Sequence, residues 1–332
     1  MNDVQSAKSL VLRYFDALES AEIGALAEVV ERFTAKDYLV RAVHPFNEIH
    51  GASACAEQLI APIWRSIRPL ERRQEVFMAA PNLIDGGLWV TSMGKLLGLF
   101  DEPLLGIPAH RKLVMLPYCE FHKVDGDKIV ESAFFCDLIS LMQQVGLHPL
   151  PMQTGAAILN PGPKTQDGLL FAPQDPSESQ ATLDLIMRMC SDLVDKDGFQ
   201  SPDSSLADTW HETMLWFGPA GIGATYTIPR YQLQHQGPFR EGLDQIDFNG
   251  HVLEHAEGAY GGWFGWPNLK IRQGRGFVGM PASEQMTEMR VVDVYRRDGD
   301  KLAENWIFID MLHYLKLLGL DVLDRSSSIH GQ

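Results

Sequence analysis

The stretch Gly279-Met280-Pro281-Ala282 repeats Gly106-Ile107-Pro108-Ala109, which lies 173 residues earlier in the chain. At the same offset Asp298-Gly-Asp-Lys301 repeats Asp125-Gly-Asp-Lys128, and twelve of the 42 positions from 106 to 147 are identical without a gap. The repeated unit, at roughly 145 residues, is longer than the roughly 20–50 residues of a solenoid repeat. The sequence therefore predicts a duplicated domain.

Each copy begins with helical spacing of apolar residues and ends with strand signals. The helical positions are Leu10, Val11, Tyr14, Phe15 and Leu18 in the first copy, with a second short helix over 26–33, and Leu183, Ile186, Met187 and Cys190 in the second copy. Ser179 or Thr182 is expected to cap the helix of the second copy. The predicted strands are 111–123, 128–137, 286–297 and 301–310, joined in pairs by Asp-Gly turns. Helices followed by an antiparallel sheet predict an α+β domain, twice.

The length of 332 residues fits two domains, and a proline-rich stretch separates them. Six prolines lie between 148 and 180, where a helix or an inner strand cannot form. We therefore predict a first domain over 1–150, a linker over 151–178 and a second domain over 179–325.

Composition excludes several classes of partner. The chain carries 28 Lys plus Arg against 43 Asp plus Glu, a formal net charge of −15, so neither nucleic acid nor an anionic membrane surface is an expected partner. No apolar run approaches the roughly 18–20 residues that span a bilayer, and the N-terminus has no signal-peptide pattern. The four widely spaced cysteines predict free thiols and a cytoplasmic location.

The end of each copy resembles the SnoaL-like polyketide cyclase domains of the nuclear transport factor 2-like superfamily. The shared pattern is a Gly-x-Pro turn, a strand, a hairpin and a strand ending in Glu-x-Trp-x-x-x-Asp, here Glu304–Asp310 and, with Ala133 in place of Trp, Glu131–Asp137. The resemblance implies two tandem cone-shaped domains, each a curved antiparallel sheet wrapped around a pocket with N-terminal helices. It also implies chemistry without a metal or other cofactor, and an intramolecular pseudo-dimer packed sheet to sheet; further homo-oligomerisation stays open.

In that family the strand-terminal Asp is the general acid/base, a role that the resemblance transfers to Asp310 and Asp137. On a strand Trp306, Phe308 and Asp310 share one face, and apolar rings beside a carboxylate raise its pKa toward neutrality. Such a group can accept and donate a proton near pH 7. The alternative role is a cap for the following helix.

Aromatic residues and histidines gather in the second copy and predict a pocket for a flat, partly apolar ligand. The predicted ligand-binding residues are Trp216, Tyr231, His251, His255, Tyr260, Trp263, Trp306 and Phe308. An aromatic core would explain the same residues.

Two motif matches are set aside. The segment 274–279 fits the dinucleotide fingerprint G-x-G-x-x-G, but Pro281 and a strand-like run follow it where a helix is required. His251-Val-Leu-Glu-His255 fits an H-x-x-E-H zinc pattern, but the surrounding glycines favour a short strand, and no metal is expected.

Two functions remain from the sequence. The first is a cofactor-independent cyclase or isomerase that moves protons on a small carbonyl-bearing, polyketide-like substrate through an Asp acid/base. The alternative is a non-catalytic protein of the same fold that binds a small molecule; it is favoured by Leu96 and Tyr260, which stand where the family often has a His.

Overall fold

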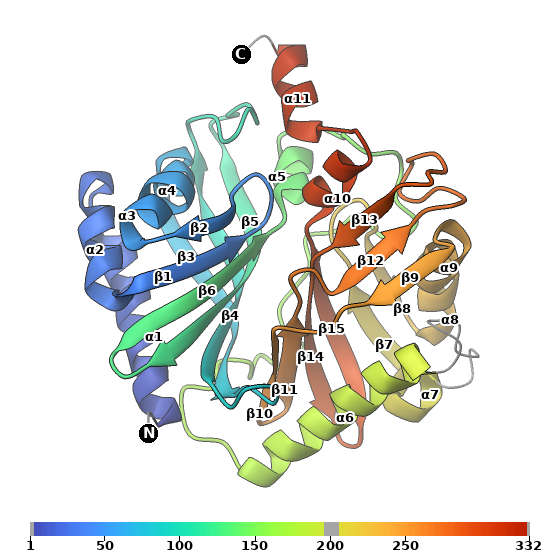
Figure 1. The fold of residues 1–332 in the computed structure, drawn as a ribbon, viewed down its shortest axis with the longest axis horizontal. Coiled ribbons are helices and arrows are strands. Elements are labelled where there is room, and N and C mark those ends of the chain that lie inside the picture. Colours follow the sequence, from blue (N-terminus) through green and yellow to red (C-terminus); the bar gives the residue numbers. More distant parts are fainter. Residues whose placement is uncertain (1–2, 196–205, 331–332) are drawn as a thin grey trace. The chain divides into compact units, whose positions relative to one another are not determined.

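The computed structural model describes residues 3–195 and 206–330, which divide into two compact units (Figure 1). Unit 1 contains residues 1–149, 165–173 and 321–332, and unit 2 contains 150–164 and 174–320. The proline-rich stretch is therefore shared between the units, and the last helix of the chain belongs to unit 1.

Unit 1 consists of N-terminal helices followed by a six-stranded sheet of order β2-β1-β6-β5-β4-β3. Its elements are α1 (Val4–Ser20), η1 (Ile23–Ala25), α2 (Leu26–Phe33), β1 (Thr34–Ala42), β2 (Asn47–His50), α3 (Ala52–Cys55), η2 (Ala56–Ile60), α4 (Ala61–Ser66), β3 (Ile67–Pro81), β4 (Leu88–Phe100), β5 (Leu113–Asp125), β6 (Lys128–Cys136), α5 (Leu138–Gln144) and the C-terminal α11 (Val322–His330).

Unit 2 repeats this plan with a six-stranded sheet of order β10-β11-β14-β15-β7-β8 and adds a three-stranded sheet, β13-β12-β9. Its elements are α6 (Pro176–Asp195), α7 (Leu206–Thr209), β7 (Trp210–Phe217), β8 (Ala224–Tyr226), α8 (Ile228–Tyr231), η4 (Gln232–Gln236), α9 (Gly237–Gly242), β9 (Gln245–Phe248), β10 (Leu253–Glu257), β11 (Tyr260–Phe264), β12 (Leu269–Arg272), β13 (Met286–Met289), β14 (Val291–Asp298), β15 (Lys301–Ile309) and α10 (Met311–Leu317).

The two six-stranded sheets share one topology. Read from the other end, the sheet of unit 2 runs β8-β7-β15-β14-β11-β10, and the parallel pair β7–β15 stands where unit 1 has the parallel pair β1–β6. All other pairs in both sheets are antiparallel. Each unit is an α+β domain with a curved sheet and helices before it, which confirms the predicted fold class (Figure 1).

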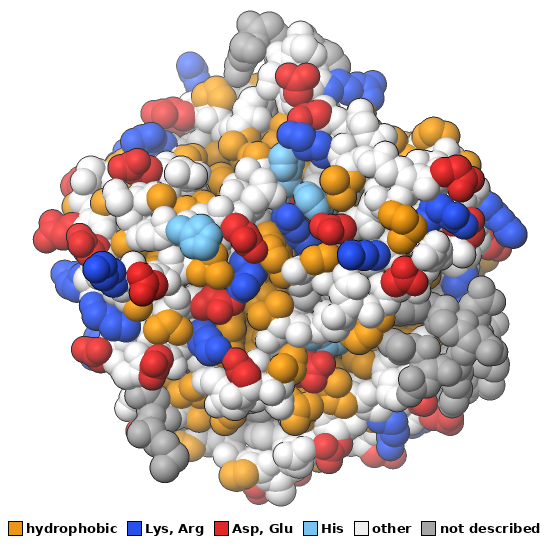
Figure 2. Space-filling model, viewed as in Figure 1, with side chains coloured by type: hydrophobic (Ala, Val, Ile, Leu, Met, Phe, Trp, Pro, Cys, Tyr) orange, Lys and Arg blue, Asp and Glu red, His pale blue; other side chains and the backbone are white. Residues whose placement is uncertain are grey.

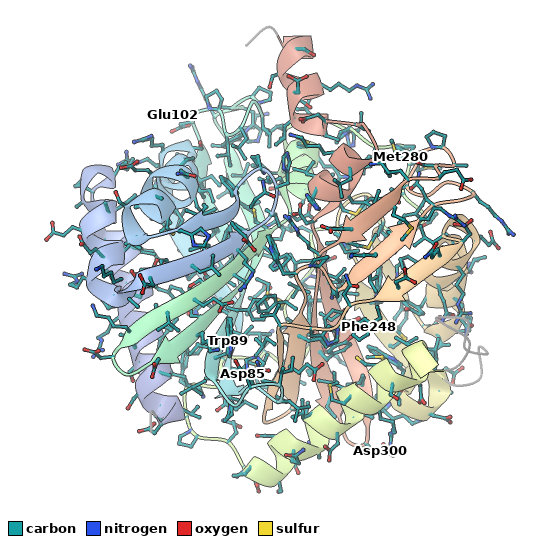
Figure 3. All side chains as sticks on the ribbon, in the orientation of Figure 1. Asp85, Trp89, Glu102, Phe248, Met280 and Asp300 are labelled. Carbon is teal, nitrogen blue, oxygen red and sulfur yellow. The ribbon has the colours of Figure 1, made fainter. Side chains whose placement is uncertain are left out.

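The predicted strands exist with small shifts, except that one of them is two strands. The run predicted over 286–297 breaks at Arg290, because β13 pairs with β12 in the small sheet whereas β14 pairs with β11 and β15. The Asp-Gly hairpin between β14 and β15 carries Asp300 at its turn (Figure 3).

The predicted cap of the long helix in unit 2 is wrong. The helix α6 begins at Pro176, and the Asp175 carboxylate accepts a hydrogen bond from the Ser177 backbone N–H at 2.8 Å. Thr182 lies inside the helix, where its hydroxyl donates to the Gly258 carbonyl. Proline is favoured in the first turn because its missing N–H would be unpaired there, so the helix starts one turn earlier than its apolar spacing indicates.

The surface carries charges of both signs. On the face drawn in Figure 2, acidic and basic side chains are interspersed, without a continuous basic field. In the described part of the chain no helix has the length and apolar character needed to cross a membrane. All four cysteines are free thiols, as expected.

Candidate functional site

A cavity of about 350 Å³ opens in unit 2 between the six-stranded sheet and the helical segments α6, η4 and α9. Its walls are mostly apolar, and Arg240 is the one Lys or Arg among the described residues that line it. Phe248, at the end of β9 (Figure 3), also lines the cavity and is 42% exposed, so it lies at the opening. The size fits a small-molecule site.

The floor of the cavity is a row of side chains across three strands. Trp263 on β11 pairs in register with Asp293 on β14, and Asp293 pairs with Ile307 on β15. Residues directly opposite on neighbouring strands point to the same side of a sheet. The next row repeats this with Tyr295 opposite Asn305, so β14 and β15 present their odd-numbered residues to the cavity.

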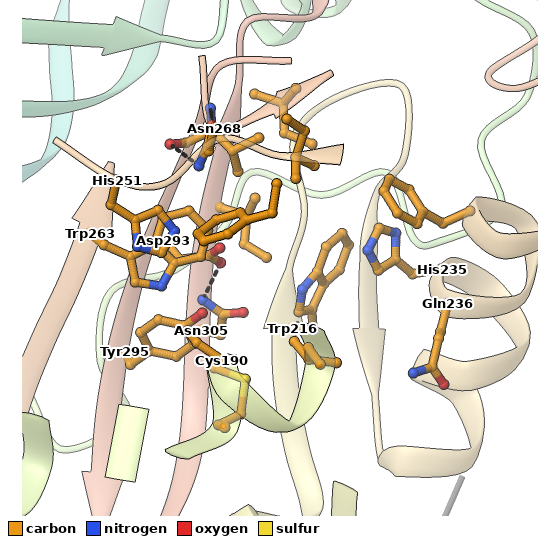
Figure 4. Close-up of a pocket in the computed structure, with 18 of the residues that line it drawn as sticks. Cys190, Trp216, His235, Gln236, His251, Trp263, Asn268, Asp293, Tyr295 and Asn305 are labelled. Carbon is orange, nitrogen blue, oxygen red and sulfur yellow. Dashed lines mark hydrogen bonds between the residues drawn. The ribbon is translucent and has the colours of Figure 1, made fainter. Parts of the chain in front are cut away.

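Asp293 is the buried carboxyl group of this floor. The Asn305 side-chain amide donates to its Oδ1 at 2.8 Å (Figure 4). Burial raises the pKa of Asp293 to about 8, although the hydrogen bond from Asn305 and the nearby Tyr295 hydroxyl lower it. At neutral pH this group can therefore act as a proton donor or, in its ionised fraction, as a proton acceptor.

Two indole–imidazole stacks flank the carboxyl group. The ring of His251 lies on Trp263 with centroids 4.2 Å apart and planes 10° apart, and His251 Nδ1 is 2.9 Å from Glu254 Oε1. The ring of His235 lies on Trp216 at 3.9 Å and 22°. Figure 4 shows Asp293 and Asn305 between the two stacks. This arrangement suits a flat ligand placed against the floor.

Four of the predicted ligand-binding residues meet in this cavity. Trp216, Tyr231, His251 and Trp263 all line it. Trp306 and Phe308 do not, because they are the even-numbered residues of β15 and face the other side of the sheet. There Trp306 stacks on Phe217 and donates its N–H to the Pro161 carbonyl at 2.8 Å. They belong to the core of unit 2 rather than to the site.

His255 and Tyr260 are absent from the cavity wall for the same reason. On β11 Tyr260 is three residues from Trp263, so its side chain lies on the opposite face of the sheet. On β10 Glu254 pairs with Trp263, so the next residue, His255, also points away from the cavity. Both side chains are buried. Within one strand, residues 251 and 255 would share a face. Because β10 begins only at Leu253, His251 lies before the strand, and its side chain does not follow this alternation.

Asp310 and Asp137 act as helix caps. The Asp310 carboxylate accepts from the His313 backbone N–H at 3.2 Å and from Arg290 Nη1 at 3.1 Å, and Asp310 is 2% exposed. Asp137 accepts from the Ser140 backbone N–H at 2.8 Å and caps α5 in the same way. Neither lines the cavity of its unit. Their recurrence at one offset coincides with a repeated helix start, the alternative role that the sequence left open.

The two motifs that were set aside lack the helices that their patterns require. The segment 274–279 forms a turn closed by a bridge between Phe277 and Met280, with no helix after it. The segment 251–255 leads into the strand β10, as expected. Within residues 3–195 and 206–330, no three His, Cys, Asp or Glu side chains are grouped so as to hold a metal ion.

The matching place in unit 1 is filled by an ion pair. Glu120 stands 173 residues before Asp293 and is paired with Arg72, whose guanidinium lies 4.0 Å from the Phe15 ring centroid. Burial alone would raise the pKa of Glu120, but the Arg72 guanidinium outweighs it, and the pKa is lowered. The remaining cavity is about 40 Å³, too small for a substrate.

Sequence reasoning missed Asp293. Its signal was present, since a single carboxylate interrupts the apolar run Val291-Val292-Asp293-Val294, and Glu120 repeats an acidic residue at the same offset. Burying a carboxylate costs folding free energy unless it has a partner, so an acidic residue in the same buried strand of both copies indicates either a partner or a function.

No sequence profile of a protein family and no curated protein matches the chain. A solved structure from Jannaschia sp. CCS1, classed as a SnoaL-like polyketide cyclase, shares 22% identity over 42% of this chain and 90% of that one, with a TM-score of 0.33. A polyketide cyclase structure from Xanthomonas campestris shares 20% identity over 44% and 100%, with a TM-score of 0.35. An NTF2-like protein from Burkholderia xenovorans shares 13% over 42% and 96%, with a TM-score of 0.34.

Proposed function

We propose that the cavity of unit 2 is the active site of a cofactor-independent enzyme that moves protons on a small, neutral, carbonyl-bearing molecule, with isomerisation or ring closure as the result. Both units are proposed to be SnoaL-like domains, of which the second performs the chemistry. The observation that carries the proposal is Asp293, a buried carboxyl group on an apolar cavity floor.

The proposed step is proton abstraction beside a carbonyl group. The Asp293 carboxylate takes a proton from the α-carbon, the C–H electron pair moves into the enolate, and the enolate oxygen takes the negative charge. Return of the proton to another carbon completes an isomerisation. In a ring closure the enolate carbon attacks a second carbonyl, whose π electrons move to its oxygen, and the resulting alkoxide takes the proton back from Asp293. A base with a pKa near the working pH is suited to both directions of this transfer.

Neighbouring groups support this chemistry. Asn305 holds the Asp293 carboxyl in place. Tyr295 and Tyr231 bring two phenols to the same cavity, where Tyr231 can donate to an enolate oxygen. Burial raises the pKa of Tyr231, so its hydroxyl keeps its proton at neutral pH. Preorganised donors of this kind stabilise developing negative charge in a cavity from which water is excluded.

The test is hydrogen–deuterium exchange at the α-carbons of 2-tetralone in D₂O, followed by mass spectrometry. Wild-type protein should accelerate exchange, and Asp293→Asn should slow it by roughly 10²-fold or more, the usual scale for loss of a general base. Asp310→Asn is the matched control and should keep the wild-type rate, because Asp310 lies outside the cavity.

The alternative is a non-catalytic binding protein. It is supported by the hydrogen bond that Asp293 already accepts from Asn305, since a structural carboxyl group would make the same contact. Under this alternative 2-tetralone binds but its exchange rate equals that of the buffer, and Asp293→Asn alters affinity alone. Exchange that is unaffected by Asp293→Asn would reject the assignment of the base.

A further inference from the structure

The cavity of unit 2 contains two polar side chains that the proposed chemistry does not use. His235 and Gln236, at the end of η4, both line it. Gln236 is 7% exposed, and its Oε1 is buried without a hydrogen-bond partner among the described residues; His235 Nδ1 is in the same state. Buried polar atoms are nearly always hydrogen-bonded, so two adjacent exceptions require an explanation.

The fold itself does not require polar residues at these positions. The segment α8–η4–α9 of unit 2 matches α3–η2–α4 of unit 1 element by element at an offset of 176, with Pro238 corresponding to Pro62. At this offset His235 and Gln236 correspond to Leu59 and Ile60, which line the small cavity of unit 1. The same helical turn is therefore built with apolar side chains in the copy whose cavity is filled.

Both side chains lie on a π-helical turn that unit 1 also has, in η2. The segment η4 (Gln232–Gln236) is a single π-helical turn, closed by the Gly237 N–H bonding to the Gln232 carbonyl. Single π-turns inside helices are frequent at functional sites. His235 is further held by its stack on Trp216, so its ring has a fixed place beside Gln236.

The chemistry of the pair indicates what it binds. Burial lowers the pKa of His235 to about 3, so the imidazole is neutral at physiological pH. Gln236 Oε1 is a hydrogen-bond acceptor and repels a carboxylate. A hydroxyl group can instead donate its proton to Gln236 Oε1 and form a second hydrogen bond with the neutral imidazole of His235. The pair is thus suited to a hydroxyl group.

We propose that His235 and Gln236 form a second polar subsite, which binds a hydroxyl group of the substrate. Figure 4 shows this pair and Asp293 on opposite sides of Trp216. The substrate would then be a neutral, flat hydroxy-ketone whose hydroxyl and carbonyl groups lie at opposite ends of an apolar ring system. The inference rests on the proposed function only in taking the same cavity as the substrate site.

The test compares the affinities of three probes, measured by quenching of tryptophan fluorescence: 2-tetralone, 6-hydroxy-2-tetralone and 6-methoxy-2-tetralone. Wild-type protein should bind the hydroxy compound about tenfold more tightly than 2-tetralone, which corresponds to about 1.4 kcal/mol. The methoxy compound cannot donate a hydrogen bond and should gain nothing. This comparison needs no variant, so it stands even if a substitution fails to fold.

Gln236→Ile introduces the residue that unit 1 carries at the same position. It should reduce the preference for the hydroxy compound to less than about twofold while leaving the affinity for 2-tetralone unchanged. Gln232→Ile is the matched control, because Gln232 is on the same π-turn but does not line the cavity; it should keep the full preference.

The outcomes separate this subsite from the proposed enzyme function. No preference for the hydroxy compound in wild-type protein, or an equal preference in Gln236→Ile, overturns the subsite. Tighter binding of 6-carboxy-2-tetralone than of the hydroxy compound also overturns it and indicates Arg240 instead. A preference for the hydroxy compound without deuterium exchange upholds the subsite and rejects the enzyme function. Deuterium exchange without this preference upholds the enzyme function and rejects the subsite.

Discussion

The buried state of Asp293 predicts how the stability of the protein depends on pH. Its pKa is about 8 in the folded protein, against an ordinary value of 3.8. Between these values the folded state binds one proton that the unfolded state has released. A group whose pKa is raised on folding contributes stability that is complete below the unfolded pKa and is lost as the pH rises toward the folded pKa.

The expected magnitude follows from this difference of one proton. Each pH unit within the window costs about 1.4 kcal/mol of unfolding free energy, so the loss between pH 5 and pH 8 is roughly 4 kcal/mol. Asp293→Asn removes the titrating group but keeps a polar side chain of the same shape. The variant should therefore gain about 1.4 kcal/mol per pH unit relative to wild type from pH 5 to pH 8, and the difference should level off above about pH 9.

Urea unfolding at each pH unit from 5 to 9 measures this difference, because all other titrating groups are common to both proteins. Asp300→Asn, in the exposed hairpin turn between β14 and β15, is the control and should give a profile parallel to wild type. A parallel profile for Asp293→Asn would show that the carboxyl group is solvated in the folded protein, and the argument from burial would fail.

Two further predictions concern the ion pair of unit 1 and the helix caps. Arg72→Met leaves the Glu120 carboxylate buried without the guanidinium and should cost about 3–5 kcal/mol of unfolding free energy. Glu120→Gln should cost less, because Arg72 keeps Glu19 at 3.4 Å. The double variant should recover part of the loss in a double-mutant cycle, and additive losses would contradict the pairing. Asp137→Ala should cost about 1 kcal/mol of stability and Asp137→Asn less, because Asn is also a good cap. Both Asp137 variants should exchange deuterium into 2-tetralone at the wild-type rate, and a slower rate would return a catalytic role to Asp137.

The fold was predictable because the repeat and the periodicities agree. The offset of 173 aligns the hairpin of one copy with that of the other, and the structure has β5–β6 and β14–β15 at those places. The break at Arg290 was not predictable, since the run from Met286 has strand character throughout. It depends on which strands the two halves of the run pair with, and these strands are distant in the sequence.

The site was only partly predictable, because alternation along a strand defines two faces but does not tell which one meets the helices. Choosing the even-numbered residues of β15 selected Trp306 and Phe308; the cavity uses Asn305, Ile307 and Ile309 instead. The capping role of Asp310 was an open alternative at the sequence level. In the structure Asp310 stands at the start of the helix that follows the strand, and its carboxylate accepts from the His313 backbone N–H.

The difference between the two copies follows from the length of two strands. Glu120 pairs across β4 with Ser92, which pairs with Phe77 on β3; in unit 2 Asp293 pairs with Trp263, which pairs with Glu254 on β10. Phe77 thus corresponds to Glu254.

Arg72 lies five residues before Phe77, still within β3, whereas β10 begins at Leu253, only one residue before Glu254. The strand β10 therefore has no position that corresponds to Arg72, from which a cation could reach the carboxyl group of Asp293. The shortened strand removes both the charge that would ionise Asp293 and the side chain that would fill the space above it. An open cavity and a protonated carboxyl group at neutral pH are then two consequences of one structural change.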